Sequence, residues 1–146
     1  MINQNNGLDT HRNNNTVLSG TGVTLYVLGG GNINANTVLN ISAPTSGQYA
    51  GLALWFGDTN SVSYAGSNSG TFQGAIYAPK GDVSYSGNGG STSTCTRLIA
   101  GSIDLSGGAT ANFNNTGCPA LTASGAVLTW SGVGSSPTSG APKLVQ

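Results

Sequence analysis

The sequence predicts an all-β protein, a single-stranded parallel β-helix (β-solenoid) of about six coils of 20–25 residues. Three observations lead to this prediction: a five-residue pattern that recurs six times, a second apolar series that runs in step with it, and Gly, Asn and Ser between the segments. A repeat of this length with alternating apolar positions is typical of strands stacked coil upon coil. Right-handed winding is expected, since parallel crossovers strongly prefer that hand.

The first series combines an aliphatic residue or Thr, a large apolar residue two places later, and then small residues. Its copies occupy residues 16–20, 39–43, 62–66, 83–87, 103–107 and 128–132. The second series comprises residues 22–27, 51–56, 74–77 and 97–100, with Ala120-Leu121 as a weak last member. A third, more polar series passes through Ile33, residues 109–111 and Phe113. Each coil therefore contains two or three short strands joined by turns.

The repeats divide the chain into a β-solenoid domain over residues 1–132 and a Gly/Ser/Pro-rich tail over residues 133–146. Residues 1–15 form a polar N-terminal leader, and residues 143–146 are expected to form a last short strand. Residues 42–50 insert a turn, because Pro44 cannot donate a hydrogen bond to a strand ladder.

The composition is unusual for a folded chain. Gly, Ser, Thr and Asn account for 74 of 146 residues, but the 37% of hydrophobic residues are arranged periodically, which favours a packed core over disorder. Four Lys and Arg balance four Asp, and Glu is absent. This neutral sequence offers neither a basic surface for nucleic acid nor a polybasic patch for anionic lipid. A Glu-free, Asn/Ser/Thr-rich surface is typical of extracellular β-rich proteins.

The two cysteines, Cys95 and Cys118, are 23 residues apart, which is one coil length. Matching positions on neighbouring coils lie about 5 Å apart, within disulfide range. We therefore expect a disulfide and an oxidising compartment. The alternatives are two buried free thiols or a metal site, for which two thiolates and the distant His11 make an incomplete ligand set.

Catalytic residues are not evident. Acid–base chemistry of the kind that β-helix lyases and hydrolases perform needs clustered acids, bases or a metal. The four Asp lie in separate stretches, and Asp82 and Asp104 occupy different repeat positions. We predict no enzymatic activity, no cofactor and no metal site.

Aromatic residues recur at coil spacing on two kinds of strand position. Tyr64, Tyr85 and Trp130 share a strand face with the aliphatic residues that open each copy of the first series, which predicts a stacked internal ladder. Tyr26, Trp55 and Tyr77 in the second series are better candidates for exposure. Their recurrence at coil spacing could reflect either packing between coils or contact with a ligand.

Four segments taken in order resemble a known family. They are Gly20–Tyr26, Ser42–Gly51, Gly74–Lys80 with Tyr85–Asn88, and Cys95–Ser102. Together they resemble the C-terminal region of bacterial TadE/TadG-like proteins, which are associated with tight-adherence (Flp) pilus assembly. The resemblance implies an envelope protein anchored by an N-terminal membrane helix, with this region outside the cytoplasmic membrane. It implies no catalytic residues.

The leading functional prediction is a non-enzymatic, extracytoplasmic structural or adhesion domain of a Tad-type pilus assembly or cell-surface protein. One alternative is a carbohydrate- or surface-binding module that uses Tyr26, Trp55 and Tyr77. Another is a self-assembling solenoid fibre, because uncapped coil ends leave strand edges open. Expected partners are other pilus or envelope proteins, further copies of the chain or a glycan, with no nucleic acid and no membrane contact by this chain.

Overall fold

The computed structural model is a three-sided β-solenoid of about four turns. It describes residues 7–10, 16–65, 70–86 and 95–106, with the backbone of 121–123 and 126–128. No helix occurs among these residues, so none of them forms a helix long and apolar enough to cross a membrane. The strands are β1 (Leu8–Asp9), β2 (Val17–Thr21), β3 (Leu25–Val27), β4 (Gly31–Ile33), β5 (Val38–Ser42), β6 (Leu52–Phe56), β7 (Val62–Ala65), β8 (Phe72–Ser86), β9 (Cys95–Ser106), β10 (Leu121–Ala123) and β11 (Ala126–Leu128).

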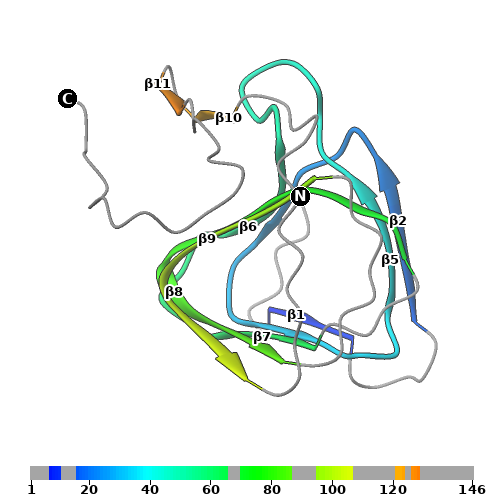
Figure 1. Ribbon diagram of the computed structural model, residues 1–146, viewed down its shortest axis with the longest axis vertical. Helices are drawn as coiled ribbons and strands as arrows, with labels where there is room; N and C mark the ends of the chain where they lie inside the picture. The colour runs from blue at the N-terminus through cyan, green and yellow to red at the C-terminus, as the bar shows by residue number, and fades with distance from the viewer. Residues whose placement is uncertain are drawn as a thin grey trace, which may run out of the picture.

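Three parallel ladders form the three sides, which give the triangular outline of Figure 1. We call them the β4 face, the β5 face and the β6 face. The β4 face stacks β1, β4, β7 and the ends of β8 and β9. The β5 face stacks β2, β5 and the starts of β8 and β9, and the β6 face stacks β3, β6 and the middle of β8 and β9. Each turn visits the β4, β5 and β6 faces in that order, and the long strands β8 and β9 bend through the corners.

The predicted fold class is confirmed, but the predicted number of coils and the assignment of repeat copies to successive coils are wrong. Copies 16–20 and 39–43 of the five-residue pattern lie on the β5 face, whereas copies 62–66, 83–87 and 103–107 begin on the β4 face. The β4 and β5 faces carry the same inside–outside alternation, so the pattern alone cannot distinguish one of these faces from the other. The described residues therefore make about four turns instead of six coils. The hand of the winding stays a prediction.

Turn lengths vary more than predicted. Along the β4 face, Leu8 pairs with Gly31, Gly31 with Val62, Val62 with Val83 and Val83 with Ile103, which are steps of 23, 31, 21 and 20 residues. The predicted insertion at 42–50 lies in the longest of these turns. Parallel pairing fixes only the strands, so extra residues can leave the coil at a corner without disturbing the ladder.

The two ends of the chain also depart from the prediction. Leu8 and Asp9, within the predicted leader, form β1 and pair with β4. Leu121 and Leu128, expected in further solenoid strands, belong to β10 and β11, which pair antiparallel with each other. Residues 109–113, Trp130 and the tail 133–146 lie outside the described residues.

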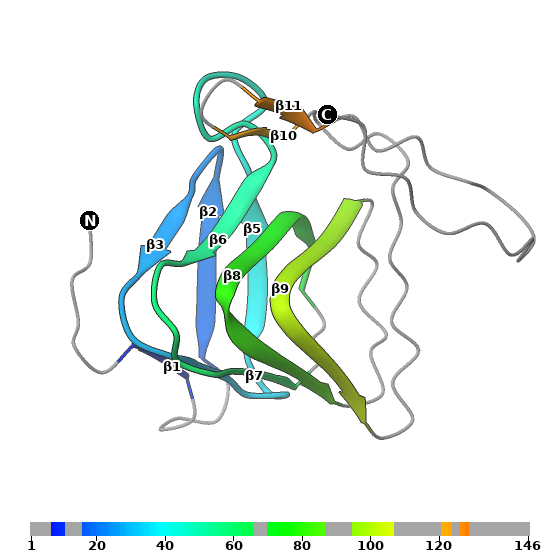
Figure 2. The same ribbon diagram turned by 90° about the vertical axis from the view of Figure 1, so that its left-hand side faces the viewer.

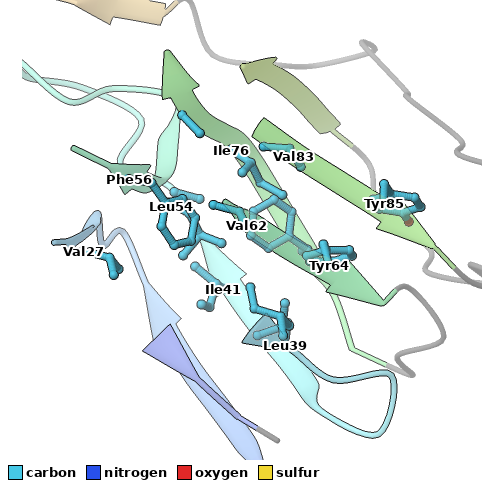
Figure 3. Close-up of a cluster of buried hydrophobic side chains, with 14 of the residues drawn as sticks. Val27, Leu39, Ile41, Leu54, Phe56, Val62, Tyr64, Ile76, Val83 and Tyr85 are labelled. Atoms are coloured by element: carbon cyan, nitrogen blue, oxygen red, sulfur yellow. The ribbon is translucent and has the colours of Figure 1, made fainter. Parts of the chain in front are cut away.

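Side chains that point inward from the three faces fill the solenoid (Figure 3). The strand β4 alternates buried, exposed and buried positions, as a strand with one face on a core must. Tyr64 and Tyr85 lie inside, 5% and 8% exposed, with rings stacked at 5.0 Å between centroids and 12° between planes. The predicted internal ladder is thus confirmed for these two rings. The largest fully buried side chains are Phe56, Ile33, Leu39, Ile41, Leu54, Val62 and Val83.

The core prediction fails at the last described strand. Ile103 and Leu105 occupy the inward positions below Val83 and Tyr85, yet they are 48% and 54% exposed. Among the described residues β9 pairs only with β8, so an inward position there has a neighbouring coil on one side only.

Buried polar groups at the corners are satisfied by bonds between turns. Thr10 and Thr37 are both buried, and the Thr37 hydroxyl donates to Thr10 Oγ1 at 2.7 Å. Thr10 donates in turn to the carbonyl of Asn32 at 3.3 Å and accepts from the Asn34 amide at 2.9 Å. A buried hydroxyl without a partner would be costly, so this network stabilises the corner between the first two turns.

Candidate functional site

The predicted exposed aromatics form a row on the outer side of the β6 face. Tyr26 of β3 is in register with Trp55 of β6, and Trp55 is in register with Tyr77 of β8. Ile99 of β9 continues the same position. Figure 2 shows these four strands side by side. We call Tyr26, Trp55 and Tyr77 the aromatic row; all three side chains are half-buried.

Neighbouring rings in the aromatic row meet edge to face. The centroids of Tyr26 and Trp55 are 5.0 Å apart with planes at 78°, and those of Trp55 and Tyr77 are 6.0 Å apart at 65°. Edge-to-face contact is a favourable aromatic geometry, worth about 0.5–1.5 kcal/mol per pair beyond area burial. The rings therefore hold one another in place, and no two neighbours form a single flat platform.

A bulge in β6 supplies the apolar base of the row. Leu52 pairs with Ala75 and Leu54 with Ile76, so Ala53 is an extra residue in β6. A bulge re-aims the side chains on either side of it. Leu54 points into the main core, while Leu52 joins a second small cluster with Ala75, against which Trp55, Tyr77 and Ile99 pack. The Thr24 hydroxyl donates to the Leu52 carbonyl at 2.7 Å and supports the backbone there.

Gly57 makes room for the first ring of the row. A Cβ at position 57 would lie 2.3 Å from the Tyr26 hydroxyl oxygen and 2.8 Å from two carbons of its ring. The Tyr26 side chain therefore extends across the end of β6, where only glycine leaves enough space.

Tyr49 is a fourth aromatic residue of this surface, and the sequence analysis did not single it out. It lies in the inserted turn, which closes through a 2.7 Å bond from the Gly51 amide to the Pro44 carbonyl. Its ring is 44% exposed and lies 6.0 Å from Trp55, with planes at 52°. The signal that could have found it is its position in the one long interruption of the repeat. We call Tyr49, the aromatic row and Ile99 the outer patch.

Charge is sparse around the outer patch. Arg97 is in register with Ala75, so it occupies the outer position two residues before Ile99. Arg97 is itself engaged in an interaction and is half-buried. Arg97 therefore lies beside an aromatic and apolar surface.

Two of the acidic residues, Asp58 and Asp82, accept hydrogen bonds that support the solenoid. Asp58 accepts from the Gly29 amide at 3.1 Å and from the Asn60 amide at 3.3 Å, which ties one turn to the next. Asp82 accepts from the Ser102 hydroxyl at 2.6 Å. Because Asp82 pairs with Ser102 and Asp104 with Ser84, these two carboxylates do not stack. The described part of the chain holds no cluster of three or more His, Cys, Asp or Glu that would suit a metal ion. His11 lies outside that part.

Cys95 begins β9 on the β5 face, in register with Gln73, and it is 1% exposed. No free cysteine occurs among the described residues. Cys118 lies outside the described residues, so the Cys95–Cys118 bridge stays a prediction.

Comparison with protein families finds a model that matches most of the chain. The model of the family described as "Domain of unknown function (DUF7305)" matches residues 1–116. The chain belongs to this family. No curated protein and no solved structure matches the chain. The DUF7305 match does not connect the chain to TadE/TadG-like proteins, and that resemblance stays a prediction.

Proposed function

We propose that this DUF7305 domain is a non-enzymatic adhesion module that contacts its target through the outer patch. The observation that carries the proposal is the outward row of Tyr26, Trp55 and Tyr77, in register on three adjacent strands and joined by the exposed Tyr49. A rigid scaffold that displays aromatic side chains is suited to binding, because little conformational freedom is lost when the rings are covered.

The ring geometry favours a target with ring-shaped apolar faces. The planes of Tyr49 and Trp55 meet at 52° with centroids 6.0 Å apart, so the two ring faces point in different directions. A ligand ring can then stack on one aromatic face while its edge meets the other. A sugar ring has such an apolar face, and Arg97, two residues before Ile99, is a hydrogen-bond donor at the border of the patch.

The charge distribution supports a neutral target. The net charge of the chain is zero, and the outer patch itself consists of Tyr, Trp and Ile side chains. A phosphate backbone or an anionic lipid surface would need several Lys or Arg side chains on one face. The target that we propose is therefore a neutral glycan of a surface polysaccharide, which agrees with the carbohydrate-binding alternative predicted from the sequence.

The proposed setting is extracytoplasmic, in a pilus-type or other surface protein of a bacterium. Three sequence features support this setting: the resemblance to TadE/TadG-like proteins, the absence of Glu, and two cysteines one coil apart. A structural role within such an assembly is compatible with adhesion, since a stacked β-helix is a stiff spacer as well as a display surface.

Retention on insoluble polysaccharides, cellulose and chitin among them, and on a glycan array tests the proposal. We expect wild-type protein to be retained and Trp55→Ala to lose at least about tenfold in affinity, since truncation of a central aromatic typically costs 2 kcal/mol or more. Tyr49→Ala is expected to weaken binding without affecting the core, because its side chain is largely exposed.

Ser84→Ala is the matched control, because Ser84 points outward on the β4 face, away from the outer patch. Circular dichroism of each variant separates lost binding from lost folding. Equal retention of wild type and Trp55→Ala would assign the aromatic row to packing alone. Absence of wild-type binding to every glycan and surface tested would leave a purely structural domain.

A further inference from the structure

Both ends of the described solenoid leave apolar side chains incompletely covered. The side chains that are only partly buried against the main core come from its two ends: Leu8, Leu18, Val23 and Leu25 precede β4, and Leu98 and Ala100 belong to β9. Beyond them, Ile103 and Leu105 of β9 are 48% and 54% exposed. The incompletely covered part of the core is thus confined to the first and last turns.

The strand edges at these two ends are open among the described residues. There, β1 pairs only with β4, β2 only with β5, β3 only with β6, and β9 only with β8. An open edge presents backbone N–H and C=O groups to another strand. In a parallel solenoid the edge of the last turn is complementary to the edge of the first turn, because every turn repeats the same ladder.

We propose that a second copy of this chain stacks head to tail on the first, its initial turn continuing the ladders of β9. Leu8 and Ile103 lie in one inward column of the β4 face, through Gly31, Val62 and Val83. Leu25 and Leu98 lie in one inward column of the β6 face, through Leu54 and Ile76. Stacking one step further places Leu8 of the second copy against Ile103, and Leu25 against Leu98, so apolar side chains meet apolar side chains.

The outer patch extends across the same junction. Tyr26 begins the aromatic row and Ile99 follows Tyr77 at the same register position, so the second copy's Tyr26 would lie against Ile99. Head-to-tail contact joins two different surfaces and does not close on itself, which produces filaments instead of dimers. Such a filament would carry the outer patches of successive copies in one continuous stripe.

Two like charges, on Asp9 and Asp104, would oppose this contact, so removing one of them should strengthen the association measurably. The outward column of the β4 face contains Asp9, Asn32, Ser63, Ser84 and Asp104. Stacking would bring Asp9 of one copy next to Asp104 of the other, and like charges directly opposite on neighbouring strands are destabilising. Removal of one of these charges is therefore expected to tighten the contact by about two- to fivefold.

Light scattering after size-exclusion chromatography, over a series from micromolar to millimolar chain, tests the proposal. We expect the mass of the wild type to grow with concentration, and the mass of Asp104→Asn to grow at lower concentration. Ile103→Lys is expected to remain at the mass of one chain, because it places a charge on the inward column at the junction. The Ile103 side chain is already 48% exposed, so this variant is expected to fold, which circular dichroism checks.

Ser63→Lys is the matched control, since Ser63 is exposed on the outward β4 column in the middle of the stack. It should associate as the wild type does. A constant single-chain mass at every wild-type concentration overturns the proposal and shows that the chain's own segments cover the ends. Association that Ser63→Lys abolishes, or that Ile103→Lys preserves, overturns it in favour of contact through the faces. Because no glycan is present, these outcomes are independent of the adhesion proposal.

Discussion

The inner and outer aromatic residues of this solenoid use the same residue types at the same coil spacing, but they pack differently. Inside the β4 face, Tyr64 and Tyr85 stack almost parallel at 5.0 Å and are less than a tenth exposed. Outside the β6 face, Tyr26, Trp55 and Tyr77 meet edge to face and remain half-buried. Strand parity separates the two sets, because successive side chains of a strand point to opposite faces. Recurrence along the sequence therefore identifies aromatic side chains that stack in one column, but it does not show whether that column lies inside the core or on the outer surface.

Truncating one ring from each set tests this comparison most strongly. Tyr64→Ala should lower the free energy of unfolding by about 3–5 kcal/mol, as for other large aromatic residues in cores, because a cavity remains inside the solenoid. Trp55→Ala should cost about half as much, since its side chain keeps contact with water in the folded state. Urea denaturation monitored by circular dichroism measures both. Equal losses would mean that the outer row is as much a part of the core as the inner ladder.

The predicted disulfide would stabilise the inner side of the last described turn, where Cys95 is buried. Reduction of a Cys95–Cys118 bridge should lower the free energy of unfolding by about 3 kcal/mol in the chain-entropy model of a 24-residue loop. Thermal melting with and without reductant measures the change, and thiol titration of the unreduced protein counts free cysteines. Two free thiols in protein exported to an oxidising compartment would contradict the bridge and weaken the extracytoplasmic assignment.

The smallest expected effect is a difference between the inner and outer aromatic residues in how the stability of the protein depends on pH. Burial of the Tyr85 phenol raises its pKa above the ordinary value of about 10, because desolvation disfavours the charged phenolate. Above that ordinary value the unfolded chain loses the Tyr85 proton while the folded chain retains it. The stability that this residue contributes is thus fully present below pH about 10 and is lost as pH rises through the folded pKa.

Tyr85→Phe should therefore flatten the fall of stability on the alkaline side, as measured by denaturation at a series of pH values. Tyr49→Phe is the control from the outer patch, since the Tyr49 side chain is 44% exposed and lies outside the main core. An alkaline curve that Tyr85→Phe does not alter would mean that another group controls stability there.

Several parts of the fold could be predicted from local pattern. The alternation in Val62-Ser-Tyr64 and Val83-Ser-Tyr85 correctly gave strands with these side chains inside. The second series gave the correct order of β3, β6, β8 and β9 strands on one face. Its aromatic members, predicted to be the better candidates for exposure, are half-buried on the outer side. These features depend on residues two positions apart in one strand or one coil apart in the sequence. Both spacings can be recognised directly in a repetitive sequence.

Other parts depended on contacts that no local pattern encodes. Residues 16–20 and 62–66 look alike but lie on different faces, because an inserted turn changes the number of residues between equivalent positions. Tyr49 gained its place beside Trp55 only when that inserted turn folded back on the β6 face. Ile103 and Leu105 have core-like sequence but lie where only one neighbouring coil is described.

By itself, then, the sequence determined that this protein is a parallel β-solenoid, where most strands of its two apolar series lie and which of their side chains point inward. These properties follow from backbone geometry, since a strand alternates its side chains and a parallel stack repeats them at coil spacing. Only the tertiary structure decided the number of turns, the division of similar segments among three faces, and the meeting of Tyr49 with the aromatic row. Those depend on how corners of unequal length close, because a corner can absorb extra residues while the ladders on either side keep their register.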